Sequence, residues 1–247
     1  MQPTSLILVP CAPGKRKSCD LLREALQQVT DGRPELQILE ADSEELSSDE
    51  CILALDSSPH CRASEILKSR RIKVAGALSV TELLASRRIL DPGKPVESQW
   101  PQLLEGLVQA LNEETDKALT LRREEAAYFK EMGPVVGRYL KETSAVEKAG
   151  PPSAELPSPS EKSQERLGLA ANRFRNLFMR LDEIIPPPPL ATLHDVFQDA
   201  CMCMTYALQH WEREEWKKAL EYLEQASHQA GPMLRHKGLA SLKEKQA

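Results

Sequence analysis

Two short stretches of this 247-residue sequence carry side chains that bind metals or react as nucleophiles. The first stretch contains Cys11, and the second, residues 56–61, contains Asp56, His60 and Cys61. Zinc sites in proteins use cysteine thiolates, histidine nitrogens and carboxylate oxygens, usually four around the ion. Two thiols, one imidazole and one carboxylate make such a set, so these residues predict a zinc site if the fold brings them together.

The same residues also have ordinary structural interpretations. The Asp56 carboxylate or the Ser58 hydroxyl can cap the helix that follows, with His60 in solvent. Cys11 can be a small apolar residue that ends a strand, because buried free cysteine behaves as a small hydrophobic side chain. It can also be a reactive thiol, because the basic run at 15–17 and a helix N-terminus favour the thiolate. The sequence leaves these alternatives open.

The elements that must position these residues appear as short apolar runs alternating with amphipathic stretches. The predicted strands are 5–10, 35–41, 51–56 and 72–78, and the predicted helices between and after them are 19–29, 59–70 and 79–90. This alternation indicates a mainly parallel sheet with helices on both faces, a Rossmann-like three-layer α/β fold. Neighbouring parallel strands end at the same edge of a sheet, so the turn after 51–56 is expected near Cys11.

From Pro101 onward the pattern is helical, and the segment 149–163 has the composition of a disordered linker. Apolar side chains at helical spacing predict four amphipathic helices, near 121–139, 170–181, 193–211 and 216–226. Short connections favour antiparallel neighbours. The sequence therefore predicts an α/β domain at 1–115, followed by an all-α four-helix bundle at 116–240.

One bundle helix carries three further side chains that could bind a ligand. His194 and Cys201 are two turns apart on one face, whereas Cys201 and Cys203 point about 200° apart and cannot chelate one ion. Buried packing is the default interpretation of the two cysteines, and His194 is expected to cap or pack near the proline run at 186–189.

Four segments resemble a known family. They are PCAPGKRKSCDLLREAL, GRPEL, the stretch 51–67 that begins CILALD and ends HCRASEIL, and KVAGALSVTELL. In this order and with similar gaps, they resemble the bacterial domain family called DGC, to which zinc binding is ascribed. The resemblance covers about residues 1–115. It implies an α/β fold with a Pro-Cys-Ser-Gly loop after the first strand. It also implies a second motif that reads Asp-Gly-Cys-Pro, two residues, then Cys-Ala.

This chain departs from the family at the ligands themselves. Cys11 matches the loop cysteine and Asp56 matches the motif aspartate, but Ser58 and Arg62 stand where the motif has its cysteines. Cys61 lies one position early. Serine is a poor ligand beside thiolate, and arginine is none. The resemblance therefore implies either a rebuilt zinc site that uses Cys61, or a decayed site that serves only as a structural or interaction scaffold.

The loop after the first strand is also similar to that of a family of enzymes. Its pattern C-x5-K-S, from Cys11 to Ser18, resembles the C-x5-R-S loop of low-molecular-weight phosphatases, and Asp91-Pro92 resembles their general-acid Asp-Pro. Lys17 replaces the arginine, and lysine cannot give the planar, bidentate grip on phosphate. A phosphatase-like or redox enzyme that uses Cys11 is therefore an alternative, whereas a non-catalytic module is the main prediction.

The second half resembles helical-bundle domains of bacterial proteins of unassigned role, through YFKEMGPVVGRYLKE and the segment around the proline run. The bundle is predicted to contact a protein partner or a second copy. A net charge of −5 and a pI of about 5.7 do not favour nucleic acid. No apolar run approaches the roughly 20 residues that span a bilayer, and the N-terminal stretch lacks the signal-peptide pattern.

These features predict a cytoplasmic, bacterial protein whose six cysteines are reduced thiols. The predicted function is a zinc- or thiol-binding module fused to a helical interaction bundle.

Overall fold

The computed structural model of the chain describes residues 6–10, 17–46, 51–57, 63–87, 89, 93, 95–148 and 161–239. The chain forms two compact units, Met1–Arg123 and Glu124–Ala247. They divide inside one long helix, α4 (Val96–Lys148), whereas the sequence predicts a border between residues 115 and 116.

Unit 1 is built on a parallel sheet. Its strands are β1 (Leu6–Pro10), β2 (Leu36–Ile38), β3 (Ile52–Asp56) and β4 (Gly76–Ser79). They lie in the order β2-β1-β3-β4, and every described pair is parallel. The predicted α/β fold is confirmed. All but the last residue of β1 and of β3 are buried, as expected for strands covered on both faces.

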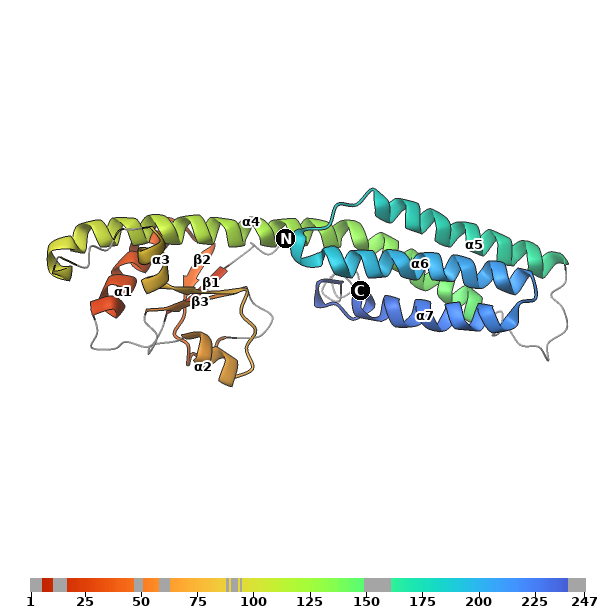
Figure 1. Ribbon diagram of the computed structural model, residues 1–247, viewed down its shortest axis with the longest axis horizontal. Coiled ribbons are helices and arrows are strands. Elements are labelled where there is room, and N and C mark those ends of the chain that lie inside the picture. Colours follow the sequence, from red (N-terminus) through yellow and green to blue (C-terminus); the bar gives the residue numbers. More distant parts are fainter. Residues whose placement is uncertain are drawn as a thin grey trace. The chain divides into compact units, whose positions relative to one another are not determined.

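Three short helices and the first part of α4 cover this sheet. The short helices are α1 (Lys17–Thr30), α2 (Ala63–Ser69) and α3 (Val80–Ser86). The connections β1 to β2 and β3 to β4 run in opposite directions across the sheet, so right-handed crossovers place α1 and α2 on opposite faces. Figure 1 shows α2 on one side of the sheet and α4 on the other. Leu107 and Leu111 of α4 are fully buried in the aliphatic core.

β4 begins four residues later than the sequence predicts, and Ile72, the first residue of the predicted strand, belongs instead to the turn that closes α2. Arg71 adopts a positive φ of 60°, and the N–H of Ile72 donates to the carbonyl of Leu67 at 2.9 Å. This is the backbone pattern that closes many helices. The strand then starts at Gly76 and ends at Ser79, whose hydroxyl accepts a bond from the N–H of Glu82 and caps α3.

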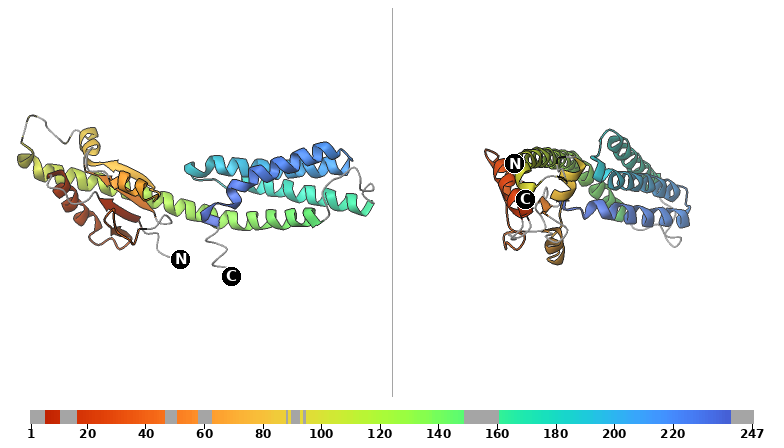
Figure 2. Two further views of the ribbon diagram at one scale, coloured as in Figure 1. Left: turned by 90° about the horizontal axis from the view of Figure 1, so that it is seen from below. Right: turned by 60° about the vertical axis from the view of Figure 1, so that its left-hand side comes forward.

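In the described part of unit 2, four long helical segments pack as an antiparallel bundle, as predicted (Figure 2). They are the second part of α4, α5 (Glu161–Asp182), α6 (Ala191–Glu212) and α7 (Trp216–Leu234), with a one-turn helix, η1 (Pro188–Leu190), before α6. Residues 149–160 of the predicted linker lie outside the described residues, and 161–163 belong to α5. The rings of Tyr139, Phe174 and Phe197 meet in the core.

The end of α6 offers a simple stability test. Glu214 has a φ of 63°, and the N–H groups of Glu214 and Glu215 donate to the carbonyls of Trp211 and His210. Glycine adopts this left-handed conformation without the cost that a Cβ imposes. We expect Glu214→Gly to raise the free energy of unfolding by about 0.5–1 kcal/mol, measured by urea denaturation. Arg213→Gly, at a φ of −87°, should lower it. Equal losses in both variants would contradict this explanation.

Candidate functional site

The centre of the sheet has the geometry of a binding site. β1 and β3 are neighbours whose following connections leave toward opposite edges, and ligands of α/β proteins bind outside the carboxyl ends of such strands. Pro10 is paired with Leu55, and Asp56 with Ser79. Of the predicted zinc ligands, Asp56 is therefore placed by the structure at the carboxyl end of β3, at this edge.

The Asp56 carboxylate is already engaged with the first turn of α2. The backbone N–H of Ser64 donates to Oδ1 at 3.1 Å, and the Ser64 hydroxyl donates to Oδ2 at 2.6 Å. Asp56 is half-buried. The interpretation of Asp56 as a residue that caps the following helix is confirmed by these contacts, and they also fix the orientation of its carboxylate.

The structure adds a thiol that the sequence analysis did not single out. Cys19, in the first turn of α1, is buried, and its Sγ lies 3.2 Å from the Oγ of the fully buried Ser57. The carbonyl of Ser57 in turn accepts a bond from the Thr81 hydroxyl at 3.4 Å. Cys19 lies three residues before Leu22 on the apolar stripe of its helix, so the pattern marks it as a core residue. The one sequence feature that could have drawn attention to this thiol is that Cys19 follows Cys11 by eight residues.

The other predicted ligands, Cys11, His60 and Cys61, lie outside the described residues, as does Ser58. Within the described ranges, no group of three or more His, Cys, Asp or Glu side chains is arranged to hold a metal ion.

In unit 2, His194 belongs to a buried polar chain. Its Nε2 lies 3.1 Å from the carbonyl of Leu181, just before the proline run, and its Nδ1 lies 3.0 Å from the hydroxyl of Tyr128. Because a carbonyl only accepts, Nε2 carries the proton and Nδ1 accepts from Tyr128. The prediction that His194 packs near the proline turn is confirmed.

The two cysteines of the same helix have the environment of packing residues. Cys201 is fully buried, and burial raises the pKa of its thiol to about 12. Cys203 is also mostly buried, burial raises the pKa of its thiol, and its Sγ contacts the side-chain oxygen of Gln229 at 3.3 Å. Thiols held in the protonated state are poor nucleophiles and poor metal ligands.

No protein-family model, curated protein or solved structure matches this sequence. The resemblance to the DGC family therefore stays a prediction. No helix in the described part of the chain is both long enough and apolar enough to cross a membrane.

Proposed function

We propose that unit 1 is a non-catalytic zinc-binding module of the DGC type, with Cys11, Asp56, His60 and Cys61 as ligands at the carboxyl edge of β1 and β3. The observation that supports this proposal is the strand register. Pro10 and Leu55 are paired, and each directly precedes a proposed ligand in the sequence, Cys11 and Asp56. The two segments that carry the ligands thus leave the sheet from neighbouring points.

The chemistry of the donor set fits zinc. Two thiolates, one imidazole and one carboxylate can complete a four-coordinate site without water, which is typical of structural rather than catalytic zinc. Each oxygen of Asp56 accepts one bond from Ser64, and a carboxylate offers about four lone-pair sites. Ser64 therefore orients the Asp56 carboxylate and leaves it lone pairs with which to bind an ion. Side chains that hydrogen-bond to metal ligands commonly have this orienting role.

The proposal assigns partner binding or self-association to the bundle. Its helices carry large apolar side chains that are 42–55% exposed, namely Leu169, Met179, Tyr206 and Leu220. Scattered apolar side chains are normal on protein surfaces. These four side chains are therefore compatible with partner binding or self-association, but they do not identify the partner.

The zinc content of the purified chain tests the proposal that unit 1 binds zinc. After purification in zinc-replete medium without an affinity metal column, we expect one zinc per chain by mass spectrometry. Cys11→Ser and Cys61→Ser should each lose it, because one thiolate is removed. Cys51→Ser is the matched control, since Cys51 precedes the opposite, amino end of β3 and should leave the zinc content unchanged. Absence of zinc from the wild-type chain, or equal zinc in wild type and Cys11→Ser, would overturn the proposal.

A second candidate function is favoured by the contacts of Asp56. If the site has decayed, the carboxylate only fixes the start of α2 and unit 1 is a scaffold. Ser64→Ala and Asp56→Ala should then each lower the stability of unit 1 by about 1.5–3 kcal/mol, the range for hydrogen bonds to charged groups, in a chain that holds no zinc. A Cys11-dependent enzyme stays a prediction.

A further inference from the structure

β2 forms one edge of the described sheet and has a strand neighbour, β1, on one side only. The residues that flank it also bond β1: the N–H of Leu6 donates to the carbonyl of Glu35 at 2.9 Å, and the N–H of Leu39 donates to the carbonyl of Leu8 at 3.1 Å. Alternate residues of a parallel strand direct their backbone groups to the same side. The N–H and C=O of Ile38 therefore point away from β1, toward the outer side of the strand.

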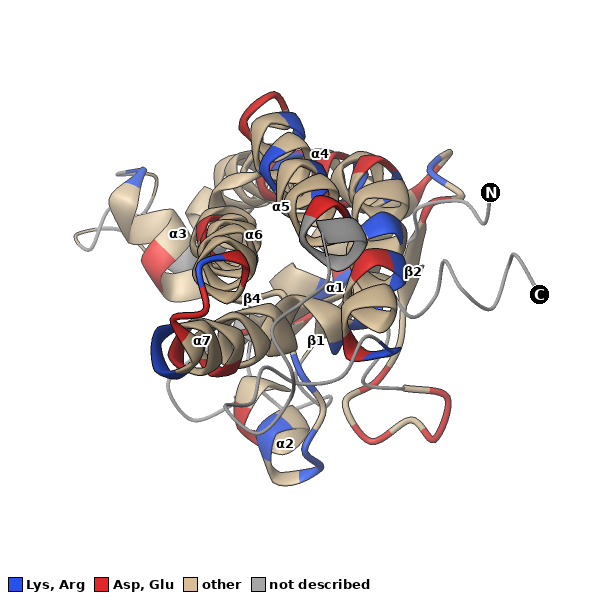
Figure 3. Cartoon of the chain, turned by 90° about the vertical axis from the view of Figure 1, so that its right-hand side faces the viewer, with Lys and Arg blue, Asp and Glu red and all other residues tan. Residues whose placement is uncertain are grey.

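The surroundings of this edge carry more acidic than basic side chains, although the Arg70 guanidinium lies against the loop after β2 and donates to the carbonyls of Ala41 and Ser43 at 2.7 and 2.8 Å. Within residues 31–46, Arg33 is the only basic residue, whereas the sequence there carries six carboxylates, Asp31, Glu35, Glu40, Asp42, Glu44 and Glu45. All of these except Glu35 are exposed, and Figure 3 shows acidic positions gathered in the loop that follows β2. The Arg33 guanidinium bonds Glu35 at 3.1 Å and Asp116 at 2.6 Å, so its charge is already paired.

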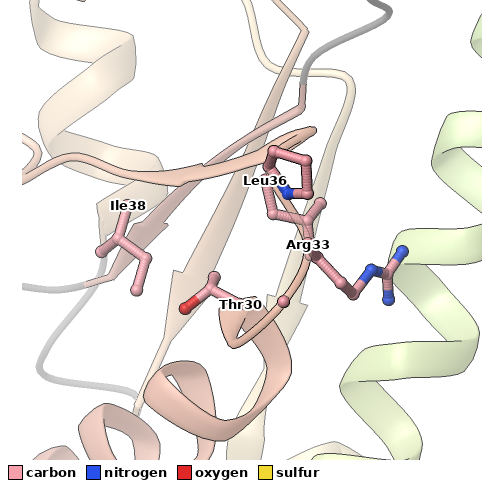
Figure 4. Close-up of a pocket in the computed structure, with 6 residues that line it drawn as sticks. Thr30, Arg33, Leu36 and Ile38 are labelled. Atoms are coloured by element: carbon pink, nitrogen blue, oxygen red, sulfur yellow. The ribbon is translucent and has the colours of Figure 1, made fainter.

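An open pocket of about 520 Å³ lies beside the same strand, lined by Thr30, Gly32, Arg33, Pro34, Leu36 and Ile38. Ile38 is 40% exposed although it is a large apolar side chain. Figure 4 shows Thr30, Leu36 and Ile38 around the hollow, while the head of Arg33 turns away toward α4. A hollow with both polar and apolar lining, which includes the exposed Ile38 side chain, thus adjoins a strand edge with outward backbone groups and an acidic rim.

We propose that the outer edge of β2 docks an extended, basic segment of a partner protein by strand addition. The backbone of the segment bonds Ile38, one of its apolar side chains enters the pocket, and its basic side chains face the acidic rim. Edge strands with outward N–H and C=O groups bind peptides in this way, and side-chain pockets give the specificity. A second copy of the same edge is disfavoured, because two acidic rims would face each other. This surface is independent of the proposed zinc site.

A nuclear magnetic resonance titration of the full, ¹⁵N-labelled chain tests the proposal with the blocked peptide Lys-Val-Arg-Val-Lys as the probe. We expect shifts concentrated at residues 30–39 and an affinity that falls at least tenfold when salt is raised from about 50 to about 300 mM. Ile38→Pro should weaken binding at least tenfold. It removes an outward N–H and leaves the bonds to β1 in place, and proline is tolerated on strand edges.

Three further measurements complete the test. Glu40→Lys combined with Asp42→Lys should also weaken binding at least tenfold. This double variant tests the role of the acidic rim even if Ile38→Pro fails to fold. Val74→Ala, at a 37% exposed side chain elsewhere in unit 1, should bind as wild type. The peptide Glu-Val-Glu-Val-Glu should not bind. Unchanged affinity in the Ile38 and charge variants, shifts mapped away from β2, or a dimer that dissociates on Ile38→Pro would overturn the proposal.

Discussion

Phe174→Ala is expected to lower the free energy of unfolding of unit 2 by about 3–5 kcal/mol, the range for removing a buried phenylalanine ring. Phe174 of α5 is fully buried, and its ring meets that of Tyr139 edge-on, with centroids 5.5 Å apart. The ring centroid of Tyr139 in turn lies 5.1 Å from that of Phe197 in α6. With aromatic residues at only 4% of the chain, this cluster is a large part of the bundle's aromatic packing. Truncation therefore removes transfer free energy and leaves a cavity between three helices.

Leu169→Ala provides the matched control on the same helix, because Leu169 is 52% exposed. It should cost less than about 1 kcal/mol, as expected for a surface substitution. Urea unfolding of the full chain, followed by circular dichroism, measures both changes. Similar losses in the two variants would mean that α5 does not pack into the core as described.

Acidification is the second large effect expected, and it acts through His194. The pKa of His194 is lowered, first because burial disfavours the imidazolium, while the carbonyl of Leu181 and the charges of Asp195 and Asp182 act in the opposite direction. Protonation would also place a hydrogen on Nδ1, the atom that accepts the Tyr128 hydroxyl. The folded bundle therefore holds His194 neutral.

The free energy of unfolding depends on pH because His194 binds its proton at different pH values in the folded and unfolded chains. Unfolded His194 titrates near its ordinary pKa of 6.5, whereas the folded form binds its proton only at lower pH. Below pH 6.5 the unfolded chain thus binds more protons, so stability falls as the pH falls, by at most about 1.4 kcal/mol per pH unit for one proton. The contribution is fully present above pH 6.5.

Unfolding of unit 2 at about pH 7 and pH 5 measures this dependence. His194→Gln should be less stable at pH 7 and should lose most of the fall in stability between the two values. His228→Gln removes an exposed histidine of α7 and should keep the fall. An equal fall in wild type and His194→Gln would contradict the role assigned to the buried imidazole.

The sequence predicted the class and order of the elements because the physical signals are local. Continuous apolar runs mark β1 and β3, and helical stripes mark the bundle. Element ends were less predictable. α5 begins at Glu161, well before the predicted apolar stripe that starts at Ala170. The prediction missed this start because the first turns of the helix are mostly polar and have little periodicity. Proximity between distant residues was not predictable at all: Cys19 in the first turn of α1 meets Ser57, which follows β3 and is 38 positions away in the sequence.

Of the candidate site, the sequence predicted the edge of the sheet and the capping role open to Asp56. It did not predict Ser64 as the partner, because the two residues are separated by eight positions in the sequence and match no short capping motif. The β2 edge was also missed. A three-residue strand gives a weak pattern, and whether a strand lies at an edge depends on the order of the whole sheet.

The helix α4 has a consequence for how this chain can be divided. It supplies buried side chains to both cores, including Leu107 and Leu111 in unit 1 and Met132 and Tyr139 in unit 2. None of residues 120–127 between them is buried, yet all are helical. A protease that needs extended backbone finds no such segment at this border, in contrast to the loops that usually join domains. A cut there would strip hydrogen-bond partners from four carbonyls on one side and four N–H groups on the other.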